Sequence, residues 1–346
     1  MNRILILLIT LSFLVAPVSA MDFTAPDVPE TAQKYMPDTA DDFGEGLKYV
    51  LKSALELVEP SLFEALRTCV SVLACGIIVG ILSELSGKRN ASIITAGSAV
   101  TGIVLFRPAN SLIHLGTETV AQISQYGKLL LPVMTSALAA GGAVKKSGAL
   151  YAATAFFDSF LSNIISKLLV PILYIYLCVA IVANLFSQPY LKDMKDFMKW
   201  LMTWGLKTVL YVFTGYISIT GVVCGSTDAA MLKATKLTIS GMVPVVGNIL
   251  SDASEAVLVS AGVMRNAVGI YGLLAICALL IGPFVRIGVQ YLLLKMTSGL
   301  CKMLGGKEMA TLMNDFSSAM GLALAMTGSV CLIFLISTVC FLKGVS

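Results

Sequence analysis

Several apolar runs in this chain are long enough to cross a bilayer as helices. The clearest lie at residues 66–82, 168–186, 267–285 and 318–342. A helix of about 20 apolar residues spans the hydrocarbon core. Over the whole chain 57% of residues are hydrophobic and 13% are charged, with a mean hydropathy of +0.87. A soluble fold needs a polar coat, so this pattern predicts an all-α polytopic membrane protein. It excludes a soluble enzyme, a nucleic-acid-binding protein and a disordered scaffold.

The first residues have the form of a targeting segment. Arg3 precedes an apolar run at 4–16, and small residues follow at Val18-Ser19-Ala20. We therefore predict a signal peptide over residues 1–20, with an uncleaved anchor as the alternative. In both cases the segment at 21–63 is exported.

Charge divides the remaining chain into two domains. Residues 21–63 carry a net charge of −6 and predict an acidic extracytoplasmic segment, which becomes an amphipathic helix from about Asp41. Residues 64–346 carry +9 and predict a multispanning membrane domain. An excess of basic residues on a membrane domain indicates loops that stay inside, here including Lys88-Arg89.

The apolar pattern of residues 64–346 predicts about seven transmembrane helices, at 66–82, 93–115, 150–165, 168–186, 208–224, 267–285 and 318–342. Two further apolar segments, 129–144 and 241–264, are interrupted by Gly, Pro or polar residues and are either full spans or re-entrant. Segments 190–204 and 303–316 are amphipathic. We expect the first to lie at the interface, with Lys192, Lys195 and Lys199 opposite its apolar side and Trp200 and Trp204 at headgroup depth.

Orientation after residue 240 depends on the segment at 241–264. If it crosses the membrane, the basic run Arg286, Lys295, Lys302 and Lys307 lies outside; if it is re-entrant, the run lies inside. The positive-inside rule favours the second arrangement.

Proline positions suggest an internal two-fold repeat, about 119–230 and 231–342. Pro132 and Pro171 are 39 positions apart, as are Pro244 and Pro283. The order of broken segment, helix, amphipathic segment and strong span is the same in both units. Apolar sequences also align by chance, so duplication and coincidence both remain open. In repeat-built transporters, broken segments such as those at Pro132 and Pro244 meet at the binding site.

A polar face follows Pro244. Asn248, Ser251, Asp252 and Glu255 are spaced to share one side of a helix. Carboxylates facing lipid would each cost about 2.5 kcal/mol or more, so this face points to a cavity, a bundle interior or the membrane surface. It is therefore either the lining of a solute path or simply the wet side of a surface helix. Asp158 and Asn163 are weaker candidates for the same path lining.

Catalytic and cofactor motifs are absent from the sequence. Neither HExxH nor GxxxxGK[ST] occurs, and one histidine and eight cysteines without a CxxC pair offer few metal ligands. We expect no enzymatic activity, no cofactor and no metal site.

The stretch at 221–274 resembles the stage III sporulation protein AE family. The matching parts are Ala234-Thr-Lys236, Pro244-Val-Val-Gly247, Leu250-Ser-Asp252-Ala253 and Asn266-Ala-Val-Gly269. The resemblance implies a multi-pass protein of the mother-cell membrane around the forespore. Its partners would be other stage III sporulation membrane proteins of one complex, along with membrane lipid. The resemblance assigns no catalytic or ligand-binding residues to this chain.

Three functions fit these observations. The first is a membrane component of the sporulation channel or secretion-like complex that links mother cell and forespore, needed for forespore development after engulfment. The second is a permease-like transporter for an unidentified small solute, using the polar broken-helix site. The third is a non-conducting structural hub of the complex. No nucleic acid is expected as a partner.

Overall fold

The computed structural model describes the backbone of residues 25–37, 43–85, 91–186, 188–242, 247–303 and 307–342. Within these ranges the side chains of residues 83, 84, 91, 94 and 220–265 are not described. The described backbone consists of helices and short turns without a strand, so the predicted all-α class is confirmed. The elements are α2 (Glu30–Gln33), α3 (Phe43–Leu85), α4 (Ala91–Ala140), α5 (Val144–Ile164), the π-helical turn η2 (Ile165–Leu169), α6 (Val170–Phe186), α7 (Pro189–Met242), α8 (Gly247–Met303) and α9 (Lys307–Leu342).

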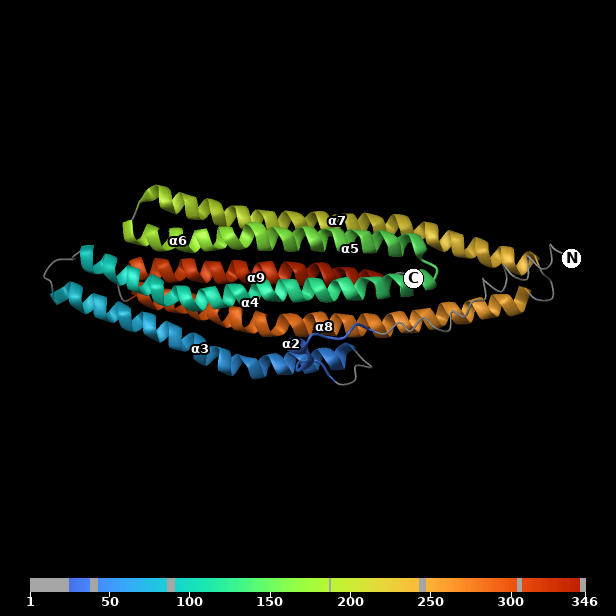
Figure 1. The fold of residues 1–346 in the computed structure, drawn as a ribbon, viewed down its shortest axis with the longest axis horizontal. Coiled ribbons are helices and arrows are strands. Elements are labelled where there is room, and N and C mark those ends of the chain that lie inside the picture. The colour runs from blue at the N-terminus through green and yellow to red at the C-terminus, as the bar shows by residue number, and fades with distance from the viewer. Residues whose placement is uncertain are drawn as a thin grey trace.

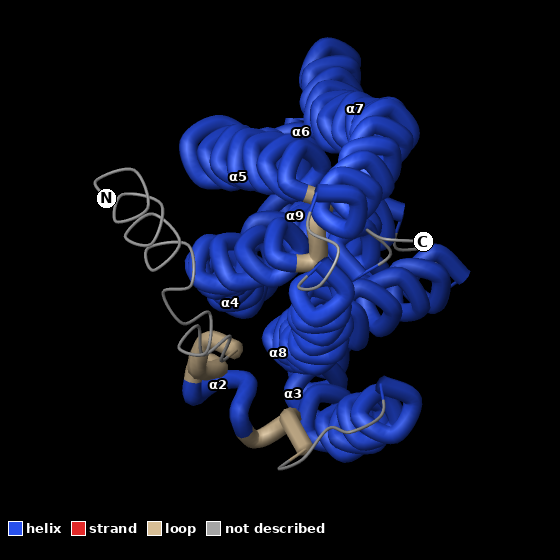
Figure 2. The backbone as a smooth tube through the Cα atoms, turned by 90° about the vertical axis from the view of Figure 1, so that its right-hand side faces the viewer, coloured by secondary structure: helices blue, strands red, loops and turns tan. Residues whose placement is uncertain are grey.

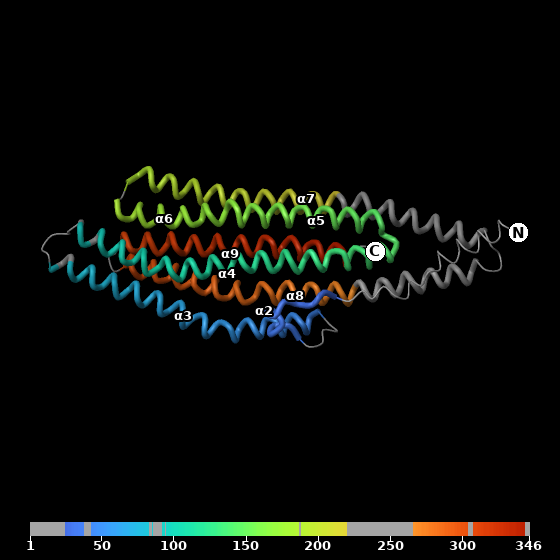
Figure 3. Tube along the Cα trace, viewed as in Figure 1, coloured from blue at the N-terminus to red at the C-terminus, as the bar shows by residue number. Residues whose placement is uncertain are grey.

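The long helices lie along one axis and alternate in direction (Figure 1). At one end of the bundle, on the left of Figure 1, α3 ends and α4 begins, α6 ends and α7 begins, and α8 ends and α9 begins. We call this the junction end. The trace in Figure 3 shows α4 turning into α5 towards the other end. The chain therefore folds as an up-and-down bundle with short connections.

Helix α9 occupies the centre of the bundle. It packs against α4, α5, α6, α7 and α8, and Figure 2 shows it surrounded by these helices along the axis. Phe316, Met320 and Val330 are fully buried, and Phe334 and Phe341 nearly so. A helix that is apolar all round belongs in the interior. The strong span predicted at 318–342 is thus the core of the bundle.

Several predicted boundaries lie inside continuous helices. The segment at 93–115 and most of the segment at 129–144 belong to α4, which ends at Ala140 and contains Pro108 and Pro132. The segment at 190–204, which we expected at the interface, lies at the beginning of α7 and continues as one helix into 208–224. In α4 the hydroxyls of Thr135 and Ser136 donate to the carbonyls of Leu131 and Pro132 at 2.7 and 2.8 Å. Pro132 leaves the carbonyl of Lys128 without its usual backbone donor, and α4 nevertheless continues to Ala140.

The π-helical turn between α5 and α6 has a local cause. Val170 donates its backbone N–H to the carbonyl of Ile165, five residues earlier. Pro171 follows at once and has no N–H for the carbonyl of Lys167. The wider turn accommodates this missing donor, as π-turns beside prolines do.

Four of the described helices are long and apolar enough to cross a membrane: Phe43–Leu82, Val144–Phe186, Asn266–Met303 and Lys307–Leu342. The count of about seven spans and the two-fold repeat stay predictions. Helices α7 and α8 have 54 and 57 residues and would extend roughly 80 Å, against about 30 Å of hydrocarbon. The bundle is therefore longer than a bilayer is thick.

The acidic N-terminal segment lies on the bundle. Within residues 25–37, Val28, Ala32 and Tyr35 are buried, and α2 packs against α8. The hydroxyl of Thr31 donates to Gln122 Oε1 on α4 at 3.1 Å. Apolar side chains thus anchor the segment against α8, which brings part of residues 21–63 against the helical bundle.

Candidate functional site

Asp158 lies between α5 and α4 with only 1% of its surface exposed. Its Oδ2 accepts a hydrogen bond from Ser124 Oγ on α4 at 2.7 Å, and its Oδ1 accepts one from Ser162 Oγ at 3.3 Å. A buried carboxyl group needs such partners to compensate for lost water. Because a serine hydroxyl can donate or accept, this site can hold the carboxyl group either charged or neutral. It is chemically able to bind a proton inside the bundle.

Asn163 is not part of that site. Its side chain is exposed, and its Nδ2 donates to the backbone carbonyl of Ser159 one turn earlier at 2.7 Å. Of these two candidates, Asp158 contacts α4 and Asn163 does not, while the path that they were expected to line stays a prediction.

The second polar candidate lies outside what the structure describes. Pro244 is outside the described residues, and so are the side chains of Asn248, Ser251, Asp252 and Glu255, although their backbone belongs to α8. Their role in lining a path stays a prediction.

The break predicted at Pro132 is located later in the chain. Pro132 lies inside α4, which ends at Ala140. The chain turns at Gly141-Gly142, where Gly142 has a φ of 92°. A residue with a side chain rarely adopts this left-handed conformation, so the turn depends on glycine. The irregular backbone is thus at the connection to α5.

A buried ion pair was missed by the sequence pattern. Lys195 on α7 pairs with Asp315 on α9, and their side chains are 7% and 10% exposed. The hydroxyl of Tyr176 on α6 donates to the backbone carbonyl of Asp315 at 3.4 Å. The prediction that Lys195 lies on the wet side of an interfacial helix is wrong, because α7 turns this lysine towards α9. An isolated acid in an apolar helix, here Asp315, was the signal that could have indicated a partner.

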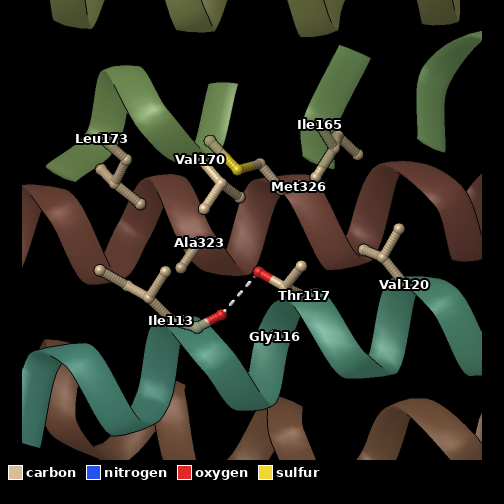
Figure 4. A pocket seen from close by; sticks show the side chains of 9 residues that line it. All are labelled: Ile113, Gly116, Thr117, Val120, Ile165, Val170, Leu173, Ala323 and Met326. Atoms are coloured by element: carbon tan, nitrogen blue, oxygen red, sulfur yellow. Dashed lines mark hydrogen bonds between the residues drawn. The ribbon is translucent and has the colours of Figure 1, made fainter. Parts of the chain in front are cut away.

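A cavity lies beside the π-helical turn, between α4, α6 and α9 (Figure 4). It is small, with room for at most about one water molecule. Thr117 contributes the hydroxyl seen in Figure 4, but it donates to the carbonyl of Ile113 on its own helix at 2.9 Å. The remaining lining is formed by Ile113, Gly116, Val120, Ile165, Val170, Leu173, Ala323 and Met326. The surface is apolar and offers little to a charged solute.

Metal ligands are not grouped among the described residues: no three His, Cys, Asp or Glu side chains come together there. The seven described cysteines form no disulfide. The chemistry that the described interior offers is therefore proton binding at Asp158 and the ion pair of Lys195 with Asp315.

Comparison with known proteins supports the resemblance found in the sequence. A family model described as stage III sporulation protein AE matches residues 31–343. The stage III sporulation protein AE of Bacillus subtilis (strain 168) is 22% identical over 245 residues. That alignment covers 70% of this chain and 61% of the relative, so the chain spans less than two thirds of the relative's length. No solved structure gives a significant match. Because the family model extends over nearly all of it, the chain belongs to the stage III sporulation protein AE family.

Proposed function

We propose that this chain is the multi-pass membrane component of a channel or secretion-like complex that joins the mother cell to the forespore. The family match over residues 31–343 carries the proposal, and the four helices able to span a membrane support it. Its partners are other stage III sporulation membrane proteins of the complex. The protein acts in the mother-cell membrane around the forespore and sustains development after engulfment.

The bundle has one orientation that suits this role. Lys192, Lys302 and Lys307 lie near the junction end, and the connection between α3 and α4 carries Lys88 and Arg89. The positive-inside rule favours this end as the cytoplasmic one. Helix α3 then begins, and α9 ends, on the exported side. The acidic segment at 21–63 faces the space between the two membranes.

Deletion of the gene tests the proposed function directly. Sporangia lacking it are expected to complete engulfment and then to arrest, with loss of late forespore transcription. A copy of the gene at another locus should restore spores. Normal spores from a clean deletion would remove the proposal.

A permease-like activity is the second candidate, and buried Asp158 favours it. A carboxyl group held by Ser124 between two helices could carry a proton during solute movement. If so, Asp158→Asn and Asp252→Asn should each abolish sporulation while the complex still assembles. Normal sporulation by both variants would show that these acids are not a transport site. A purified protein that binds its partners and moves no solute into liposomes would instead indicate a structural hub.

A further inference from the structure

A strip of α9 remains partly exposed between α7 and α8. Helix α9 packs against both neighbours, and Figure 2 shows it between them. On this strip Asn314 and Ser318 are half-buried, one helical turn apart on the same face. The residues between them, Asp315, Phe316 and Ser317, are buried. The strip therefore presents neutral polar groups at the surface of the bundle.

Two lysines reach these groups from opposite sides. Lys199 on α7 donates from Nζ to Ser318 Oγ at 3.2 Å, and Lys295 on α8 donates from Nζ to Asn314 Oδ1 at 2.6 Å. We call these four residues the basic seam. Both acceptors are uncharged, and among the described residues no ion pair joins a carboxylate to either lysine. Asp315 acts on Lys199 at longer range, but its direct ion pair is with Lys195. By contrast, Lys195 faces inward and is neutralised by Asp315.

The two lysines lie at one level of the bundle. Lys199 follows the start of α7 by ten residues and Lys295 precedes the end of α8 by eight, which is about 15 and 12 Å from the same end. The acids Asp193 and Asp196 lie nearer that end. From the seam inward, the described side chains of α7, α8 and α9 include Lys207 and Arg286 and no carboxylate other than paired Asp315.

Exposed aromatic and apolar side chains flank the seam. Trp200 and Trp204 on α7 are 56% and 54% exposed, and their ring centroids are 5.9 Å apart. On α8, Leu292 and Met296 are also exposed. Tryptophan at such a position is typical of the headgroup level of a membrane protein. The seam thus combines positive charge at that level with apolar surface.

We propose that the basic seam binds the headgroup of an anionic phospholipid. The ammonium groups of Lys199 and Lys295 contact the phosphate oxygens, while the Ser318 hydroxyl and the Asn314 amide supply further hydrogen bonds. The acyl chains lie against Leu292, Met296 and the tryptophan rings. Basic pockets between membrane helices recognise anionic lipids in this way. The inference depends on membrane insertion and not on the proposed role in a sporulation complex.

Tryptophan fluorescence gives a direct test, because Trp200 and Trp204 are the two tryptophans of the chain. The full chain is reconstituted into phosphatidylcholine vesicles with brominated phosphatidylglycerol or brominated phosphatidylcholine, and quenching gives the relative association constant. Each lysine near an anionic lipid is expected to raise the relative association constant for that lipid about fivefold. The wild type should prefer phosphatidylglycerol by up to about 25-fold, and Lys199→Gln or Lys295→Gln should each reduce this about fivefold.

Matched variants separate the seam from general surface charge. Lys302→Gln removes a lysine that lies on α8, like Lys295, but outside the seam, and it should leave the preference for phosphatidylglycerol unchanged. Lys199→Arg keeps the positive charge and should retain the preference. Circular dichroism and monodisperse elution establish folding, and Lys295→Gln keeps the test informative if one variant misfolds. Inorganic phosphate at constant ionic strength should not displace the lipid. Equal quenching by the two lipids, an equal loss in Lys302→Gln, or displacement by phosphate would each overturn the proposal.

Discussion

Ser124 Oγ donates a 2.7 Å hydrogen bond to Asp158 Oδ2, which links α4 to α5 in a part of the bundle closed to solvent. Ser124 is 4% exposed and Asp158 is 1% exposed. Two helices that are neighbours in sequence are thus joined by a polar contact as well as by apolar packing. The contribution of this contact to the free energy of unfolding depends on how much an unpaired carboxyl group in the interior destabilises the protein.

Removal of the Ser124 hydroxyl is expected to destabilise the protein more than replacement of the Asp158 carboxyl group by an amide. Ser124→Ala leaves Oδ2 of Asp158 without this partner and should lower the free energy of unfolding by about 1–3 kcal/mol. Asp158→Asn should cost less, because an amide can pair with the same hydroxyls. Denaturant unfolding in detergent, followed by circular dichroism, measures both. Asn163→Ala, at an exposed position, serves as the control and should stay within about 0.5 kcal/mol.

Disruption of the buried pair of Lys195 and Asp315 should destabilise the protein more than loss of the Ser124 hydrogen bond. Lys195→Ala leaves the carboxylate of Asp315 buried without its cation, which should destabilise the protein by about 3–5 kcal/mol. Replacing both residues together, with Lys195→Met and Asp315→Leu, should restore much of that loss because no charge then remains in the interior.

The exposed neighbour Lys192 provides the matched control for this experiment. Lys192→Ala should change stability by less than about 0.5 kcal/mol. Thermal unfolding of the three variants in one detergent gives the comparison. A Lys195→Ala protein as stable as Lys192→Ala would contradict the buried pairing.

The sequence predicted the fold class well because apolar length is a local property. Runs such as 168–186 and 318–342 must avoid water wherever they lie. Helix boundaries were harder, since a change from apolar to polar composition does not end a helix. The polar segment at 190–204 and the apolar one at 208–224 both belong to α7. Prolines also failed as boundaries, because α4 continues through Pro108 and Pro132.

The sequence also could not indicate which side chains pair across the bundle. Asp158 stood out as an acid among apolar residues, but Ser124 lies 34 positions earlier and has no pattern of its own. Lys195 and Asp315 are separated by 120 positions. Periodicity indicates which residues share a face but not which helix that face will meet. The amphipathic pattern therefore placed Lys195 towards water, although α9 lies against it.

A close approach between α4 and α9 gives a third prediction. Gly127 lies against the ring of Phe334, which is 1% exposed, and a Cβ at position 127 would overlap that ring. Gly127→Ala should therefore lower the free energy of unfolding by about 1–3 kcal/mol through overpacking. Gly148→Ala has open space and should be neutral or stabilising by up to about 1 kcal/mol. Equal stability of the two variants in thermal unfolding would contradict this packing.

The orientation of the bundle can be tested by cysteine labelling in a background without native cysteines. Gln188 and Lys302 lie near the junction end, whereas Lys145 lies in the first turn of α5 near the other end. If the junction end is cytoplasmic, a membrane-impermeant maleimide should label the Lys145→Cys variant in intact cells. The Gln188→Cys and Lys302→Cys variants should react only after permeabilisation.

The same experiment decides between the two arrangements left open for the basic run Arg286, Lys295, Lys302 and Lys307. Gln188 and Lys302 must behave alike if α6, α7, α8 and α9 meet at one end, because no membrane then separates them. Labelling of the Lys302→Cys variant in intact cells, with Gln188→Cys protected, would mean that α8 ends on the exported side. Lys295 and Lys199 would then lie towards opposite sides of the membrane and could not share one headgroup.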